Sequence, residues 1–176
     1  MLCPRCGTSM NQCREDYRYQ ESGLGNIWLV GCEVWKCDAC RNAFAVLPDA
    51  RLAAREIARI LILQPYRLDS RSIHFCRKLL GMTALQLGIR LGVHRVEVSR
   101  WENDRANIDP FNDFKLRLTL VDHIFSSCPP RVRDEVTLQT VAMMRREYNP
   151  VADVSTESIT VAWNQIAQDD MQLRVM

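Results

Sequence analysis

Histidine is scarce in this chain of 176 residues, and the three that occur, His74, His94 and His123, are isolated from one another. No Ser/His/Asp arrangement, paired-carboxylate site or glycine-rich phosphate loop is apparent in the sequence either. These absences remove the usual starting points of catalysis. We therefore expect a protein that is not an enzyme.

Long apolar runs are also missing. Leu61–Leu63 is far shorter than the roughly 18 apolar residues that mark a membrane-spanning helix. The opening Met1–Pro4 does not resemble a secretory signal peptide, so we expect a cytoplasmic protein with no membrane partner. In that reducing compartment the eight cysteines are not expected to form a disulfide framework.

The charged residues are spread unevenly along a chain of globular composition, which is 47% hydrophobic and 25% charged. Residues 67–117 hold 10 lysines and arginines against 6 acidic residues, a net charge of +4. Residues 118–176 hold 5 against 8, a net charge of −3. A basic middle segment fits a surface that faces phosphates, although the same charge is common on solvated helices.

Strand-like residues are concentrated near the N-terminus. Tyr17 and Tyr19 alternate with polar neighbours, and residues 27–30 and 34–35 are mostly β-branched or aromatic. Glycines punctuate these runs. The pattern predicts two or three short antiparallel strands.

Capping and helix-breaking residues delimit a series of helices after residue 49. The predicted helices cover residues 50–64, 70–80, 84–91, 95–102, 110–125 and 132–148, and a short one is expected around residues 159–167. The residues that mark their ends include Asp49, Asp69, Gly81, Thr83, Gly92 and His94.

Four of the cysteines form two CxxC pairs, Cys3 with Cys6 and Cys37 with Cys40. Each CxxC turn lets two thiolates bind one metal ion, and two such turns complete a tetrahedral shell of four sulfurs, which suits zinc. Because four thiolates leave no open coordination position, the spacing predicts one structural Zn²⁺ ion. Metal binding then supplies much of the folding free energy of a domain with little core.

Other interpretations of the cysteines carry less weight. A redox dithiol is expected within a βαβ unit, which is absent here. Cys13 and Cys32 compete as metal ligands, but neither belongs to a CxxC pair, so we expect them to be small core residues or spare thiols. Cys76 and Cys128 are expected to be buried in helices, Cys128 just beyond the predicted end at residue 125.

Residues 77–102 have the spacing of a helix-turn-helix. Gly88 fits the point where two short helices cross, and Gly92 fits a tight turn that requires a positive φ. Glu102 is expected to pair with Arg77. The shared core is expected to contain Leu87, Leu91, Val93, Val98 and Trp101. An ordinary pair of amphipathic helices is the alternative.

The residues around the second helix of this motif are the expected DNA contacts. Arg95 and Arg100 can each bind a guanine in a bidentate manner, and Glu97 can accept from a cytosine. Thr83 and His94, at helix starts, can contact phosphates. The full expected set is Thr83, His94, Arg95, Val96, Glu97, Arg100, Arg105 and Asn107.

Four motifs resemble the MqsA-type antitoxin family, whose members join a YgiT-type zinc finger to an XRE/Cro-like helix-turn-helix. They are CPRCG at residues 3–7, CDAC at 37–40, IHFCRKLLGMT at 73–83 and VSRWEN at 98–103. The resemblance covers roughly residues 1–121. It implies a dimeric repressor that binds a palindrome in the promoter of its own operon, the same four zinc ligands, and DNA readers at or near Arg95–Glu97 and Arg100. In toxin–antitoxin members the zinc domain also neutralises an mRNA-cleaving toxin.

Three positions depart from the family pattern. Ala84 stands where members commonly have a glutamine that can contact phosphate. Gly88 replaces a common alanine, which weakens that helix by up to about 1 kcal/mol. Asp104 replaces a glycine in a turn that aspartate tolerates.

Together these patterns predict an α+β fold: a small zinc-bound, β-rich N-terminal domain, then an all-α helix-turn-helix domain with extra C-terminal helices. The expected domains are a zinc-binding domain at 1–47, a linker helix at 48–66, an XRE/Cro-like DNA-binding domain at 67–125 and a helical extension or tail at 126–176. The leading hypothesis is a zinc-containing, sequence-specific regulator that binds double-stranded DNA as a homodimer on a palindromic operator. The alternative is an antitoxin whose main role is to neutralise a partner toxin through its zinc domain.

Overall fold

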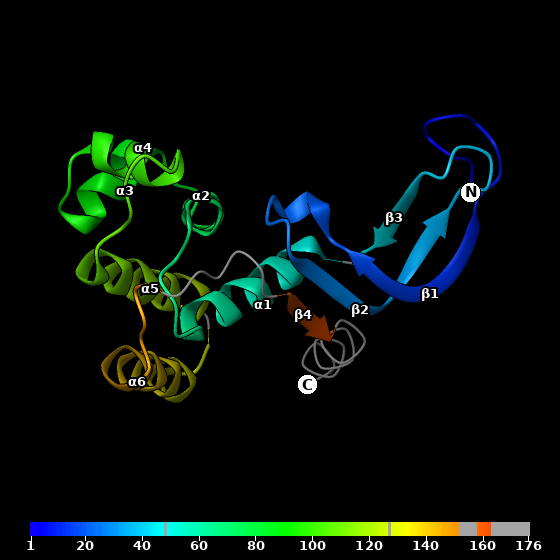
Figure 1. The fold of residues 1–176 in the computed structure, drawn as a ribbon. Helices are drawn as coiled ribbons and strands as arrows, with labels where there is room; N and C mark the ends of the chain where they lie inside the picture. The colour runs from blue at the N-terminus through cyan, green and yellow to red at the C-terminus, as the bar shows by residue number, and fades with distance from the viewer. Residues whose placement is uncertain (48, 127, 152–157, 163–176) are drawn as a thin grey trace. The chain divides into compact units, whose positions relative to one another are not determined.

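The computed structural model describes residues 1–47, 49–126, 128–151 and 158–162 (Figure 1). The chain divides into two compact units. Unit 1 comprises Met1–Ala54 and Ser158–Met176, and unit 2 comprises Arg55–Glu157. Strands dominate the first and helices the second, which confirms the predicted α+β fold. None of the described helices is long and apolar enough to cross a membrane.

Unit 1 is built on an antiparallel sheet with the strand order β1–β2–β3. The elements are β1 (Asn11–Arg18), the 3-10 helix η1 (Gln20–Ser22), β2 (Ile27–Lys36) and β3 (Ala43–Val46). Alternate side chains of β2 fill the core, and Ile27 and Leu29 are fully buried before Gly31. Gly31 has a φ of 68°, and after it Cys32 and Val34 are the buried residues. The expected antiparallel strands are confirmed, but β2 runs through a glycine that was expected to interrupt it.

A fourth strand comes from the far end of the chain. β4 (Ile159–Ala162) pairs in parallel with Ile27–Val30 of β2, on the edge opposite β1 (Figure 1). The helix expected around residues 159–167 is therefore wrong for residues 159–162, while 163–167 lie outside the described residues. Ile, Thr and Val favour extended backbone, and their partner strand is too distant in sequence for a local pattern to show the pairing.

Helix α1 (Ala50–Leu63) leads from unit 1 into unit 2. The Asp49 carboxylate accepts a hydrogen bond from the Arg51 N–H at 2.9 Å, as expected of an N-cap. Ala53, Ile57 and Leu61 are buried along one side of the helix.

The described part of unit 2 continues with α2 (Ser70–Leu79), α3 (Ala84–Leu91), α4 (Arg95–Glu102), α5 (Pro110–Ile124) and α6 (Pro130–Arg146). These bounds lie within about two residues of the predicted ones, and the capping side chains of α2, α3 and α4 act where expected. The Asp69 carboxylate, for example, accepts from the Ser72 N–H at 2.8 Å. The expected extra C-terminal helix is α6.

A fully buried ion pair lies inside unit 2. Asp113 and Arg117 are one turn apart on α5, with Asp113 Oδ1 2.9 Å from Arg117 Nε. The Asp113 carboxylate also accepts from the Tyr148 hydroxyl at 2.7 Å, and burial together with this carboxylate raises the pKa of Tyr148. The Arg117 guanidinium donates to the carbonyls of Leu61, Ile62, Gln64 and Tyr66. Arg117 thereby satisfies carbonyl groups that the end of α1 leaves without helical partners.

Candidate metal centre and nucleic-acid interface

The two CxxC turns share the same backbone hydrogen bonds. In each, the N–H of the first cysteine donates to the carbonyl five residues on, and the residue after the second cysteine donates back to the first cysteine. The four bonds are Cys3 N to Thr8 O at 2.8 Å, Gly7 N to Cys3 O at 2.9 Å, Cys37 N to Asn42 O at 2.9 Å and Arg41 N to Cys37 O at 2.8 Å. The residue after each second cysteine has a positive φ, 74° at Gly7 and 59° at Arg41. Both turns therefore present their sulfurs from equivalent backbone.

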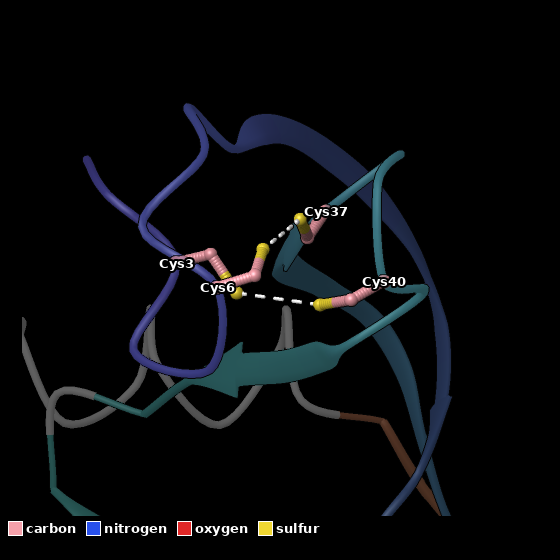
Figure 2. A group of neighbouring side chains, drawn as sticks. All are labelled: Cys3, Cys6, Cys37 and Cys40. Atoms are coloured by element: carbon pink, nitrogen blue, oxygen red, sulfur yellow. Dashed lines mark hydrogen bonds between the residues drawn. The ribbon is translucent and has the colours of Figure 1, made fainter.

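The sulfur atoms of the four predicted zinc ligands converge (Figure 2). Cys3 and Cys6 come from the loop before β1, and Cys37 and Cys40 from the loop between β2 and β3. All four Sγ atoms lie within 4.8 Å of one another, with 3.6 Å between Cys3 and Cys40 and 3.4 Å between Cys6 and Cys37. Zinc bound tetrahedrally at about 2.3 Å holds its sulfurs about 3.8 Å apart. The cluster can thus hold one metal ion, and its all-thiolate donor set fits zinc.

The thiols of this cluster differ in acidity. Hydrogen bonding to the side chain and backbone of Thr8 lowers the pKa of Cys6 to about 6. The Asn42 backbone N–H lowers the pKa of Cys40, but burial and the three neighbouring sulfurs outweigh it and raise that pKa to about 12. Because thiols must be deprotonated to bind a metal ion, metal binding by this cluster releases protons.

The remaining cysteines lie outside this cluster. Cys13 Sγ is 3.7 Å from the Val34 carbonyl oxygen, and Cys32 is buried in the sheet, so neither of these competing ligands joins the four. Cys76 is buried in α2 as expected. Cys128 is half-buried in the connection between α5 and α6, and the expectation that it lies in a helix is wrong.

Gly88 on α3 lies close to the backbone that leads into α4. A Cβ atom at this position would lie 2.8 Å from the Val93 carbonyl oxygen and 3.3 Å from the Arg95 nitrogen. Gly92 ends α3 with a φ of 72°. Of the predicted shared core, Leu87, Leu91, Val98 and Trp101 are buried and Val93 is half-buried. The structure therefore has the expected helix-turn-helix geometry.

Gly88→Ala is expected to destabilise unit 2 by about 1–3 kcal/mol. Alanine favours the helix by up to about 1 kcal/mol, but the added Cβ meets backbone that no side-chain rotation can move away. Urea unfolding followed by circular dichroism at 222 nm measures the change. Ile89→Ala, at the exposed next position, is the control and should change stability by less than about 0.5 kcal/mol. A Gly88→Ala protein as stable as wild type would contradict the close approach.

Side chains at the starts of α3 and α4 are held by caps. The Thr83 N–H and hydroxyl both donate to Gln86 Oε1, at 2.8 and 3.0 Å, and Thr83 Oγ1 accepts from the Gln86 N–H at 3.2 Å. This capping box occupies both donors of Thr83 and leaves Gln86 Nε2 available. His94 Nδ1 accepts from the Val96 N–H at 3.3 Å, so a neutral His94 ring carries its proton on Nε2.

Glu102 pairs with Arg77, as the sequence predicted. Arg77 Nε donates to one carboxylate oxygen at 2.5 Å and Arg77 Nη2 donates to the other at 3.0 Å. The Arg77 and Glu102 side chains are only 11% and 8% exposed. The pair ties the end of α4 to α2 and keeps this carboxylate away from the solvent-exposed face of α4.

That exposed face carries Arg95, Val96, Ser99, Arg100 and Asn103. Arg100 Nη1 donates to Glu97 Oε1 at 3.0 Å, so Glu97, which was expected to contact a base, is engaged with Arg100. Ser99, which was not among the expected contacts, is exposed on the same side of the helix as Arg95, four residues earlier. We call these five residues the α4 face.

The loop after α4 begins with a left-handed residue. Asp104 has a φ of 57°, and the Arg105 N–H donates back to the Arg100 carbonyl at 2.9 Å, a helix ending that usually uses glycine. Arg105 and Asn107, the other expected contacts, are both exposed in this loop. They lie next to the α4 face in sequence.

Comparison with known proteins supports the DNA-binding part of this description. Residues 73–116, from α2 into α5, match the helix-turn-helix family model. The match indicates DNA binding and transcriptional regulation by this part of the chain, and the four-cysteine cluster adds a candidate metal site. No curated protein and no solved structure matches the chain. The finer resemblance to MqsA-type antitoxins stays a prediction.

Proposed function

We propose that this protein is a zinc-containing, sequence-specific DNA-binding regulator, and that it acts as a dimeric repressor of its own operon. The α4 face carries the proposal, because it exposes Arg95 and Arg100 on the second helix of a helix-turn-helix. Such a helix enters the major groove of double-stranded DNA with its first residues at the base edges. Two copies would bind the half-sites of a palindromic operator about 34 Å apart.

Base recognition is assigned to the α4 face. Arg95 and Arg100 each donate to O6 and N7 of a guanine. Val96, which is 42% exposed, offers an apolar contact to a thymine methyl group. Ser99 can donate to or accept from a base edge. Glu97 limits the directions in which the Arg100 guanidinium can point.

Phosphate contacts are assigned to the helix starts and to the loop after α4. His94 donates through Nε2, since its Nδ1 accepts from the backbone. Gln86 Nε2 supplies the amide that Ala84 lacks, and Thr83 acts indirectly by holding Gln86. The set is completed by Arg105 and Asn107.

A gel-shift titration on the DNA upstream of the gene tests the proposal. Arg95→Ala and Arg100→Ala are each expected to weaken specific binding about 5- to 150-fold, the loss of one bidentate contact of about 1–3 kcal/mol. Arg131→Ala, an exposed arginine on α6, is the matched control and should bind as wild type. Affinity should also fall steeply with salt. The proposal would be contradicted if wild type did not bind at low salt, or if both variants bound as tightly as wild type.

Asp104→Gly is expected to raise stability by about 0.5–1 kcal/mol because glycine adopts a positive φ without strain. It should also strengthen DNA binding, since it removes a negative charge next to residues assigned to phosphate. Asp104→Asn separates the two effects: it removes the charge while asparagine still tolerates the turn, so it should share the gain in affinity but little of the gain in stability. Urea unfolding and gel-shift titration measure them independently. Equal affinity for all three proteins would exclude the electrostatic effect.

Toxin neutralisation through unit 1 is the second candidate function. The observation in its favour is apolar exposure in unit 1: Met1 and Leu2, which directly precede Cys3, are 58% and 68% exposed, and Trp28 on β2 is 38% exposed. Co-expression with a small protein encoded beside this gene tests it. Stable co-purification that Trp28→Ala abolishes supports an antitoxin role, and separate elution of the two proteins counts against it.

A further inference from the structure

The edge of β2 at Ile27–Val30 receives a strand that fits it closely. Leu29 pairs with Val161 of β4, and Val161 is 2% exposed whereas its neighbour Thr160 is exposed. The Ile159 N–H donates to the Asn26 carbonyl at 2.9 Å. β3 pairs with the same edge only from Glu33 onward. Without β4, this edge would present unpaired backbone groups over a buried apolar layer.

In sequence, β4 is separated by the whole of unit 2 from the β2 edge with which it pairs. The chain passes from unit 1 into unit 2 within α1. At Tyr148 it still belongs to unit 2, where the Tyr148 hydroxyl donates a hydrogen bond to the Asp113 carboxylate. The Asn149 N–H donates to the Pro65 carbonyl at 2.7 Å, and β4 is the next described element. The contacts that β4 makes in unit 1 are therefore the same whichever copy of the chain supplies it.

We propose that the β2 edge is an exchange site between two copies of this chain, at which β4 of each copy completes the sheet of the other. The inference rests on the proposed function, because reading a palindrome requires two α4 helices on one DNA. The exchanged dimer buries the same side chains as the closed monomer. Protein concentration and an operator with two half-sites therefore decide between the two forms.

A second copy is the occupant that the observations favour over an unrelated partner strand. β4 already carries the pattern that the edge accepts: β-branched residues at Ile159 and Val161, and the small Ala162 at the end. Every further copy of the chain brings that same strand. No new surface has to evolve for the exchange.

Two variants test β4 and the β2 edge independently. Val161→Asp places a charge at the buried position of β4 and should detach it. Ile27 O accepts from the Tyr19 N–H on the β1 side, and successive residues of a strand face opposite edges. The Trp28 N–H therefore points towards β4, and Trp28→Pro removes it. Thr160→Asp adds the same charge on the exposed side of β4 and is the matched control.

Sedimentation of the full-length, zinc-loaded proteins without DNA tests the exchange. Wild type and Thr160→Asp should shift from monomer to dimer as concentration rises, whereas Val161→Asp and Trp28→Pro should each stay monomeric. An equal mixture of these two should form a heterodimer, because the Trp28→Pro copy can lend β4 to the intact edge of the Val161→Asp copy. Zinc content and circular dichroism establish that each variant is folded.

Wild type that stays monomeric, or Val161→Asp that dimerises like wild type, would overturn the exchange. The exchange would also be overturned if wild type dimerised and each single variant stayed monomeric, but an equal mixture of the two variants did not associate. Failure of the proposed function is a separate result: wild type would not bind the operator in the gel shift, whatever its mass in the absence of DNA.

Discussion

Removal of zinc is expected to unfold the two CxxC turns and the adjoining end of the sheet while α2 to α5 stay folded. The apolar cluster at this end is small and is made largely of the ligands themselves. It consists of Cys3, Met10 and Cys37, with Trp35, Cys40 and Phe44 packed against it. Without the metal, little buried apolar surface is left to hold the turns together. Structural zinc sites of this kind contribute about 10–16 kcal/mol of apparent binding free energy, which is also folding free energy.

Hydrogen exchange measured by mass spectrometry can check this region by region. After treatment with a chelator, or in Cys37→Ser, residues 1–10 and 36–46 should lose protection, and the helices of unit 2 should keep theirs. Cys13→Ser is the matched control because Cys13 lies outside the cluster, and it should retain one zinc ion per chain. Unchanged protection after complete loss of zinc would show that the metal does not stabilise the fold.

Arg117→Met is expected to destabilise unit 2 by about 3–5 kcal/mol. The substitution leaves the Asp113 carboxylate fully buried without its partner charge, which is the costly way to break a buried ion pair. It also removes the donor that the carbonyls of the buried residues Leu61 and Ile62 share at the end of α1. Urea unfolding monitored by circular dichroism at 222 nm reports mainly on this helical unit.

Two further variants divide the Arg117 effect into its causes. Tyr148→Phe removes a single hydrogen bond to the Asp113 carboxylate and should cost about 1–3 kcal/mol. The double variant Asp113→Leu with Arg117→Met removes both charges, so it should be less destabilised than Arg117→Met alone. A double variant that is worse than the single one would mean that the carbonyl contacts of Arg117 outweigh the ion pair.

Most of unit 2 could be predicted because the ends of its helices are marked by local chemistry. Thr83 and His94 bond to backbone within three residues of themselves, and Gly92 adopts the positive φ that its place in the turn requires. The convergence of the metal ligands was predictable for a similar reason, since each CxxC turn determines the positions of its own two sulfurs. The pair of Arg77 and Glu102 was also foreseen, because the helix-turn-helix pattern brings α2 and α4 together.

The features that could not be predicted depend on residues far apart in the chain. In sequence, Arg117 is one more cation of a basic segment. It is buried in the structure, where it binds partners such as the Leu61 and Ile62 carbonyls, which lie more than fifty residues earlier in the chain. Ile159–Ala162 is too short for periodicity to separate a strand from a helix, and its parallel pairing with β2 has no local signal.

The direction of protein synthesis has a consequence for unit 1. Residues 1–46 contain both CxxC turns and the three antiparallel strands, so they can fold and bind zinc while the ribosome is still making unit 2. The β2 edge at Ile27–Val30 must wait for β4, which is translated more than a hundred residues later. During that interval the nascent chain carries an open strand edge on an otherwise folded sheet. This protein should therefore be most prone to aggregate when the ribosome translates slowly between residues 46 and 159.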